Sequence, residues 1–244
     1  MRAQGVSAPR SSNCCGSRRG EEEAALKELS LNILDIAQNS IRAGAAHVEI
    51  ALADRADGMR ALTVTDDGCG MDEALLRRVT DPFATTRTTR PVGLGLPLLL
   101  LAAEQTGGTL TIESRTAQDA RAGTTFAAGS AHGTRVTATF DPQHIDCVPL
   151  GDLAATVVTL LQGSPEIEFC FSLSLSGMAE PFVLDTAQMR QALGGDVPLN
   201  APEVLLWAGE CVREAQAAVG AGQEPENCDR HGAGLDRGVS HDDY

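Results

Sequence analysis

Apolar residues in the first part of the chain recur with the period of a helix and then change to the alternation of strands. Residues 21–43 place leucine or isoleucine every few positions and end at Gly44, which predicts one long helix. Residues 47–52 alternate between apolar and polar, and Asp57-Gly58 is a hairpin-turn signal. Residues 60–65 therefore predict the returning strand, which runs directly into an acidic, glycine-rich turn.

The pattern continues to the end of the chain and restarts once, near Asp141-Pro142. It predicts helices over 72–79 and 94–105 and strands over 109–114 and 134–140, then a helix over 150–161, strands over 166–175 and 181–184, and helices over 186–193 and 202–219. The ends lack periodicity and are rich in small and charged residues. We therefore expect disordered tails at 1–20 and 221–244, one domain at 21–141 and a small α/β module at 145–220.

Charge and composition exclude several classes of protein. The formal net charge of −14 repels nucleic-acid phosphates, and aromatic residues make up only 3% of the chain. Lys27 is the single lysine and stands in neither a P-loop nor a protein-kinase motif. The longest apolar stretch, Val92 to Ala103, is shorter than the roughly 20 residues that span a bilayer. We expect neither a nucleic-acid nor a membrane partner.

The amino terminus and the cysteines bear on the compartment. No apolar signal-peptide core is present at the amino terminus, so we expect a cytoplasmic protein. The seven cysteines include no C-x-x-C pair, which removes the usual zinc-ribbon spacing. Their odd number suggests reduced thiols.

Polar residues with chemical potential lie on the first helix. Asp35 and Asn39 are four residues apart and share a face, whereas Ile33 points about 200° away from Asp35. A carboxylate and a carboxamide are oxygen ligands of the kind that Mg²⁺ prefers, and the carboxylate can also accept a proton from water. The alternative is an ordinary solvated helix face.

Two glycine-rich strings follow. Asp66 ends a predicted strand ahead of Gly68 and Gly70, so it can accept a hydrogen bond from an exocyclic amine; an ordinary strand-exit turn is the alternative. The run Gly93-Leu94-Gly95-Leu96 opens a helix, where free N–H groups can bind an anion or the chain can simply pack closely. It is not the dinucleotide motif.

In their order and spacing, these strings resemble the GHKL superfamily, which includes gyrase, heat-shock chaperones, sensor histidine kinases and mismatch-repair ATPases. LDIAQNSIRAGA resembles its N box, DDGCGM its G1 box, DPFATTRTTR its F box and lid, GLGL its G2 box, and GTRVTATF its final box. The resemblance covers residues 29–141. It implies an α+β fold, a two-layer α/β sandwich of the Bergerat type, here followed by the 145–220 module.

The resemblance also implies roles for individual residues. Asn39 would ligate the Mg²⁺ that bridges the ATP phosphates, and Asp35 would stand in the place of the general base. Asp66 would accept from adenine N6. The remaining candidate ATP contacts are Gly68, Gly70, the lid residues Thr85, Thr86 and Arg87, Gly93, Leu94, Gly95, Leu96, and Thr134 with Thr124 as a weaker choice.

Two departures from the family pattern bear on activity. Asp35 is one methylene shorter than the family glutamate, and Pro91 stands where the first G2 glycine would be. Three functions stay open: a slow regulatory ATPase or ATP-dependent switch acting on a protein partner through the lid or the 145–220 module, a kinase that phosphorylates a separate protein, and a nucleotide-binding module without turnover. A homodimer is left open too. No histidine precedes the N box, so we expect no phosphoacceptor histidine ahead of it.

Overall fold

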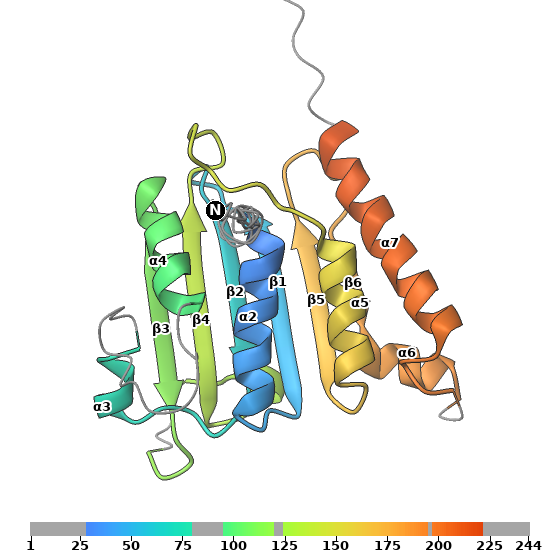
Figure 1. The fold of residues 1–244 in the computed structure, drawn as a ribbon, viewed down its shortest axis with the longest axis horizontal. Helices are drawn as coiled ribbons and strands as arrows, with labels where there is room; N and C mark the ends of the chain where they lie inside the picture. The colour runs from blue at the N-terminus through green and yellow to red at the C-terminus, as the bar shows by residue number, and fades with distance from the viewer. Residues whose placement is uncertain (1–27, 80–94, 120–123, 195–196, 222–244) are drawn as a thin grey trace, which may run out of the picture.

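Six strands pair into one mixed sheet, and helices cover one of its faces (Figure 1). A computed structural model describes residues 28–79, 95–119, 124–194 and 197–221. Its elements are α2 (Leu29–Arg42), β1 (His47–Asp54), β2 (Arg60–Asp66), α3 (Glu73–Leu76), α4 (Gly95–Gln105), β3 (Leu110–Arg115), the 3₁₀ turn η1 (Ala127–Gly129), β4 (Gly133–Phe140), α5 (Leu153–Gly163), β5 (Glu168–Ser174), β6 (Phe182–Asp185), α6 (Thr186–Ala192) and α7 (Pro202–Ala221). The predicted tails, except Ala221, lie outside these residues, as do the predicted start of the first helix and the lid.

The strand order is β3-β4-β2-β1-β5-β6. The predicted hairpin is confirmed: β1 and β2 are antiparallel, with Asp54 opposite Arg60. The Arg60 guanidinium closes this hairpin through an ion pair to Asp54, with Nε 2.7 Å from Oδ1. Strands β1 and β5 run parallel, and every other neighbouring pair is antiparallel.

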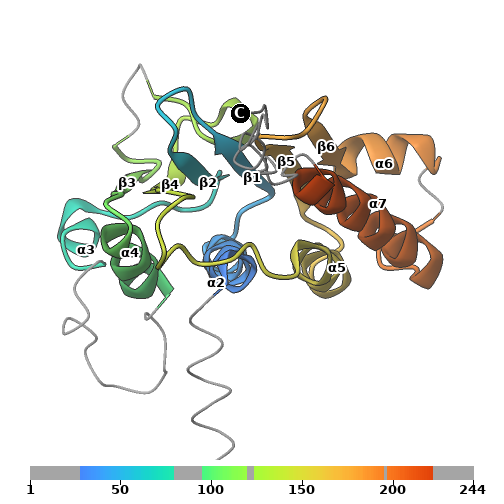
Figure 2. The ribbon, with the colours of Figure 1, turned by 90° about the horizontal axis from the view of Figure 1, so that it is seen from above.

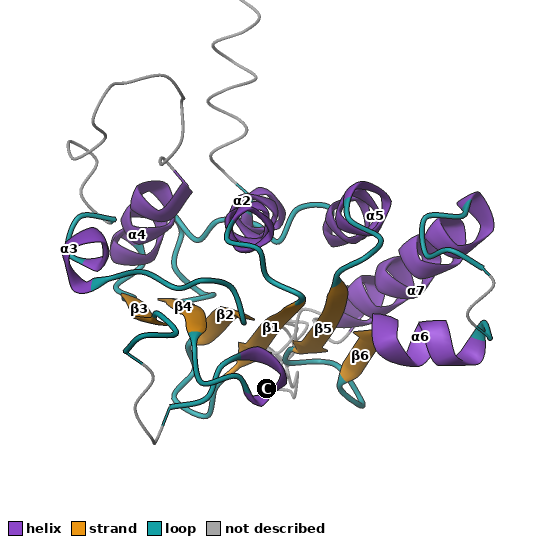
Figure 3. Cartoon of the chain, turned by 90° about the horizontal axis from the view of Figure 1, so that it is seen from below, coloured by secondary structure: helices purple, strands orange, loops and turns teal. Residues whose placement is uncertain are grey.

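Alternation along the strands explains the two layers. In β1, Val48, Ile50 and Leu52 are buried under the helices, whereas the residues between them are more exposed. Helices α2, α4 and α5 lie side by side over this face, as Figures 2 and 3 show from two opposite sides. The other face is polar; Thr63 and Thr137 meet there across β2 and β4. The two-layer α/β architecture is thus that of the Bergerat fold.

Residues 145–220 do not pack as a separate body. Strand β5 adds to the sheet beside β1 over seven residue pairs, and α5 lies next to α2. One hydrophobic cluster contains both Ile33 of the first half and Leu160 of the second. The elements predicted after residue 145 therefore extend the sheet and core of the first half.

An aspartate caps the start of each of two helices whose bounds differ from the predicted ones. The helix predicted from residue 150 begins at Leu153, because the Asp152 carboxylate accepts the Ala155 N–H at 2.8 Å. Asp72 caps α3 in the same way, and the helix predicted to reach Val79 ends at Leu76.

The four cysteines in the described ranges are free thiols. None of the helices in these ranges has both the length and the apolar composition needed to cross a membrane.

A histidine between two carboxylates joins the two halves of the sheet at the bottom of β1. His47 Nδ1 lies 2.7 Å from Asp67 Oδ2, and its Nε2 lies 3.0 Å from Glu168 Oε2 at the start of β5. The hydrogen bond to Asp67 raises the pKa of His47, although partial burial opposes the rise. Burial tends to raise the pKa of Asp67, but hydrogen bonds from the His47 backbone and side chain outweigh it and lower that pKa.

These opposite shifts predict a pH-dependent contribution to stability. The pKa of His47 is raised, so its contribution is complete below the ordinary value of about 6.5 and is lost as pH rises through the folded-state pKa. The pKa of Asp67 is lowered, so this carboxylate stays ionised at pH 5.5. We expect His47→Gln to lower the free energy of unfolding at pH 5.5. The loss should be only about 0.5–1 kcal/mol, because His47 and its partners are partly exposed, and it should be smaller at pH 9. Urea denaturation at both pH values measures the difference.

His144 provides the matched control for this substitution. It sits in the exposed turn before α5, and its Nδ1 is 3.8 Å from Asp146 Oδ2. His144→Gln should change the free energy of unfolding little at either pH. An equal loss for His47→Gln at pH 5.5 and pH 9 would show that His47 acts through packing and not through its charge.

Candidate functional site

The buried carboxylate of Asp66 is the centre of the candidate site. It ends β2, directly opposite Thr134 on β4, and only 5% of the residue is exposed. Its Oδ1 accepts the backbone N–H of Gly68 at 3.0 Å and of Thr134 at 3.2 Å. Its Oδ2 accepts the hydroxyl of Ser40, on α2, at 2.6 Å. Three separate segments therefore fix the direction of this carboxylate.

Two glycines near this carboxylate allow backbone segments to pass close to one another. Gly133 has a φ of +137°, and a Cβ there would lie 2.0 Å from the carbonyl oxygen of Asp66. Gly70 has a φ of +69°, and a Cβ there would lie 1.9 Å from the carbonyl oxygen of Arg115. Any side chain at either position would have to displace backbone. The G1 string and the start of β4 are therefore tied to glycine by contact as well as by conformation.

Burial raises the pKa of Asp66, and the hydrogen bonds from Ser40, Gly68 and Thr134 offset part of the rise. A carboxylate oxygen has more than one lone pair, so Oδ2 can accept a second donor beside the Ser40 hydroxyl. A buried acceptor discriminates strongly between a ligand that donates to it and one that leaves it unpaired. This arrangement suits recognition of an amine on a planar base.

Sequence reasoning missed Ser114 and His132, which complete the rim of the site. The Ser114 hydroxyl is 2.9 Å from that of Thr134 and accepts the Met71 N–H at 2.8 Å. His132 Nδ1 lies 2.8 Å from the carbonyl oxygen of Gly68. These contacts join the loop after β2 to β3 and β4. Thr134, the preferred threonine of the two considered, is the one that contacts Asp66.

The second part of the candidate site is the outer face of α2. Ile33 is buried and Asp35 is exposed, as their spacing predicts. Asn39 is half-buried, and its Oδ1 accepts a short hydrogen bond from the Arg42 guanidinium. Partial burial raises the pKa of Asp35, and the charge of Arg42 opposes this. Arg42, which the sequence did not single out, is thus the cation beside both residues.

The start of α4 lies against Asp35. A Cβ on Gly95 would be 3.2 Å from Asp35 Cβ and 3.4 Å from its Oδ2, so the glycine brings the helix terminus close to the carboxylate. The Leu96 side chain is buried in the core. The other candidates at this end of the site, Thr85, Thr86, Arg87, Gly93 and Leu94, lie outside the described residues.

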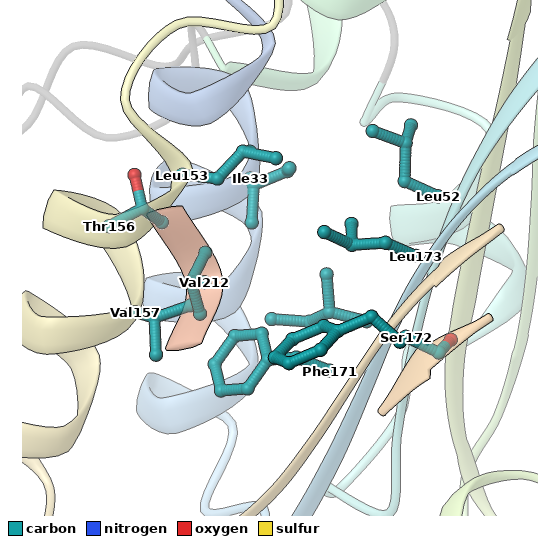
Figure 4. A pocket seen from close by; sticks show the side chains of 11 residues that line it. Ile33, Leu52, Leu153, Thr156, Val157, Phe171, Ser172, Leu173 and Val212 are labelled. Atoms are coloured by element: carbon teal, nitrogen blue, oxygen red, sulfur yellow. The ribbon is translucent and has the colours of Figure 1, made fainter. Parts of the chain in front are cut away.

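A small apolar cavity lies elsewhere, between the sheet and helices α2, α5 and α7 (Figure 4). Its volume of about 20 Å³ is room for about one water molecule. Side chains such as Ile33, Leu173 and Val212 line it. Such a void is a packing gap and offers no room for a nucleotide.

A known protein family matches the part of the chain that contains the candidate site. The family described as "Histidine kinase-, DNA gyrase B-, and HSP90-like ATPase" matches residues 22–144, which is just over half of the chain. This range contains α2, β1 to β4 and every candidate site residue.

Three curated relatives are sensor kinases. The chain is 36% identical over 92 residues to the tetrathionate sensor histidine kinase TtrS of Salmonella typhimurium, which covers 38% of this chain and 15% of that protein. It is 34% identical over 85 residues to the sensor histidine kinase CitA of Klebsiella pneumoniae (34% and 16%) and 39% identical over 77 residues to the sensor protein kinase FleS of Pseudomonas aeruginosa (31% and 19%). The chain therefore spans less than a fifth of the length of these relatives.

Two solved structures match more weakly. The Aquifex aeolicus MutL ATPase domain complexed with ADP is 16% identical, with a TM-score of 0.39 over 66% of this chain and 67% of that one. The mycobacterial sensor histidine kinase MprB is 22% identical, with a TM-score of 0.33 over 46% of this chain and 72% of that one.

Proposed function

Because this chain belongs to the family of histidine kinase-, DNA gyrase B- and HSP90-like ATPases and so carries an ATP-binding domain, we propose that it binds Mg-ATP and works as a slow regulatory ATPase or ATP-dependent switch on a partner protein. The observation that carries the proposal is the buried Asp66 carboxylate, held by Ser40, Gly68 and Thr134. In this role Asp66 accepts a hydrogen bond from the exocyclic amine of adenine.

The α2 residues fit the phosphate end of the nucleotide. Mg²⁺ usually takes one or two protein oxygens and fills its shell with phosphate oxygens and water. The described residues contain no group of three or more His, Cys, Asp or Glu suited to hold a metal by themselves. Asn39 would supply one oxygen once its hydrogen bond to Arg42 opens, and Arg42 would then be free to face the phosphates. Mg²⁺ itself would neutralise phosphate charge.

Asp35 is the candidate to hold the proton of an attacking water. It lies on the same helix face, beside Gly95, and partial burial raises its pKa above the ordinary value. Its side chain is one methylene shorter than the family glutamate, so turnover should be slow. A slow ATPase suits a switch, because the bound state then lasts long enough for a partner to respond.

The base selectivity tests this proposal directly. We expect calorimetry with Mg²⁺ present to show ATP binding at least about tenfold tighter than GTP, because guanine presents a carbonyl where Asp66 needs a donor. Excess EDTA should weaken ATP binding. Equal affinities for ATP and GTP would remove Asp66 from base recognition and the proposal with it.

The sensor-kinase relatives favour a second candidate, transfer of phosphate to a separate protein. The two functions differ in the fate of the γ-phosphate. With γ-labelled ATP and a purified partner, a kinase leaves label on the partner, acid-labile on a histidine and acid-stable on a serine, whereas a switch leaves none. A switch instead changes ATP affinity when the partner binds, and linkage requires the coupling to be reciprocal, about 1–3 kcal/mol in typical cases.

A further inference from the structure

Helix α7 presents an unpartnered face to solvent at the end of the sheet away from the candidate nucleotide residues. Val204, Ala208 and Val212 are buried in the hydrophobic core, and α7 packs against α5. With 100° per residue, the opposite arc contains positions 203, 206, 207, 210, 213, 214 and 217, and all of them are exposed. We call six of these residues the α7 face: Glu203, Leu206, Trp207, Glu210, Arg213 and Glu214.

The centre of the α7 face is apolar. Leu206 is 59% exposed and Trp207 is 53% exposed. Single exposed apolar residues are ordinary, but two large neighbours on one arc of a helix form a continuous patch. Tryptophan is also the side chain most enriched among the residues that dominate binding energy at protein interfaces. The fold gives Trp207 no core role that would explain its size.

Carboxylates flank this centre on both sides along the helix. Glu203 is four residues before Trp207, Glu210 is three residues after it, and Glu214 is one further turn along, so all three are on the same arc. Within the described residues, none of these glutamates has an ion-pair partner. Arg213 lies on the same arc, three residues after Glu210, with its guanidinium beside Gly209, and it offsets one of the three negative charges. The α7 face is therefore an apolar centre inside a net negative field.

We propose that the α7 face binds a positively charged amphipathic segment of a partner protein, most simply a helix whose leucine-type side chains cover Leu206 and Trp207 while lysine or arginine side chains reach the three glutamates. A second copy of this chain fits less well. It would bring three more carboxylates against the first three, on molecules that each carry a net charge of −14. This surface needs no bound nucleotide.

Trp207 reports on its own surface, because it is the single tryptophan of the chain. The probe is a synthetic amphipathic helical peptide made of leucine and lysine, without aromatic residues, titrated into the full chain. We expect the Trp207 emission to shift to shorter wavelength and its quenching by acrylamide to fall, with an affinity that weakens as salt is added. The same peptide with glutamate in place of lysine should leave the spectrum unchanged.

Matched variants distinguish specific binding at the α7 face from non-specific binding of a charged, apolar peptide. Glu210→Gln with Glu214→Gln should weaken peptide binding about 3–10-fold. Glu104→Gln with Glu73→Gln, on α4 and α3, makes the same change in net charge and should have little effect. Leu206→Ser should weaken binding strongly, whereas Leu101→Ser, at an α4 leucine that is 51% exposed, should not. Asp66→Asn should bind the peptide like wild type, so a failed nucleotide assignment would not be mistaken for a failed surface.

Three results would overturn the proposal. The first is that the lysine peptide leaves the Trp207 emission unchanged. The second is that Glu104→Gln with Glu73→Gln, or Leu101→Ser, weakens peptide binding as much as the α7 variants do. The third is that the glutamate peptide binds as well as the lysine peptide. A fourth result also counts against it: sedimentation of the chain alone as a dimer that Leu206→Ser disrupts would assign the α7 face to a second copy.

Discussion

Asp66→Asn is expected to weaken ATP binding at least about 100-fold while the protein stays folded. The asparagine oxygen can still accept the N–H groups of Gly68 and Thr134, and the Ser40 hydroxyl can turn to accept from the new amide. The amide then presents a donor to the amine of adenine, which leaves two donors facing each other in a buried site. Calorimetry with Mg-ATP measures the loss. Asp66→Ala is a poorer test, because it strands three internal donors and would also lower stability.

Asp67→Asn is the matched control, one residue along the chain. The Asp67 carboxylate turns away from Asp66 toward the start of β1, where it accepts the N–H groups of Ala46 and His47 at 2.8 and 2.9 Å. Its substitution should cost about 1 kcal/mol of unfolding free energy through the lost charge opposite His47, while ATP affinity stays within about threefold. If both variants lose ATP affinity equally, the turn as a whole shapes the pocket and the specific role of Asp66 fails.

Local sequence patterns were enough to predict many of the helices and strands. Helix α2 was predictable because Ile33, Ile36 and Ala37 recur on one buried face, and the β1–β2 hairpin because Asp57-Gly58 separates two alternating runs. The position of Asp66 at a strand end was equally legible. These are features that a window of a dozen residues contains.

The sequence does not single out Ser40, because its hydroxyl suggests a polar contact whereas its position on the apolar stripe of α2 suggests simple packing. It lies one turn after Ile36 and Ala37 on the buried stripe of α2, where a lone serine reads as a tolerated small residue. Only the tertiary structure shows that its hydroxyl reaches a carboxylate 26 positions away. The sequence offers one weak signal for this contact: a polar residue on a buried helical stripe, followed downstream by an acidic residue at a strand end.

The join between the two halves of the sheet was also beyond the sequence pattern. Periodicity identified β5 as a strand but says nothing about which strand it pairs with, since parallel pairing depends on contacts between residues more than a hundred positions apart, such as Val48 opposite Phe169. The restart near Asp141-Pro142 therefore predicts a small module of its own, whereas pairing with β1 places β5 in the sheet of the first half. His47, Asp67 and Glu168 come together only because β1 and β5 are neighbours.

Asp35→Ala is expected to lower the rate of ATP hydrolysis by roughly 10²–10⁴-fold while Mg-ATP affinity changes little. If Asp35 accepts the proton of an attacking water, it acts on the reaction and not on ground-state binding. Asn39→Ala should fail in the opposite way, because it removes the proposed magnesium ligand: affinity for Mg-ATP falls first, and turnover at saturating ATP falls less. Single-turnover hydrolysis, paired with calorimetry on the same preparations, separates the two patterns.

Two further measurements sharpen the role of Asp35. Asp35→Glu should raise turnover above wild type, because it restores the reach of the family glutamate, provided the longer side chain passes the start of α4 at Gly95. In wild type, hydrolysis should fall as pH drops through the pKa of Asp35, which burial holds above its ordinary value of 3.8. Because only the ionised carboxylate can act as a base, this acid limb should be absent from the residual activity of Asp35→Ala. Wild-type hydrolysis by Asp35→Ala would instead assign Asp35 to the structure or to the metal shell, and the catalytic proton would have to pass to water alone.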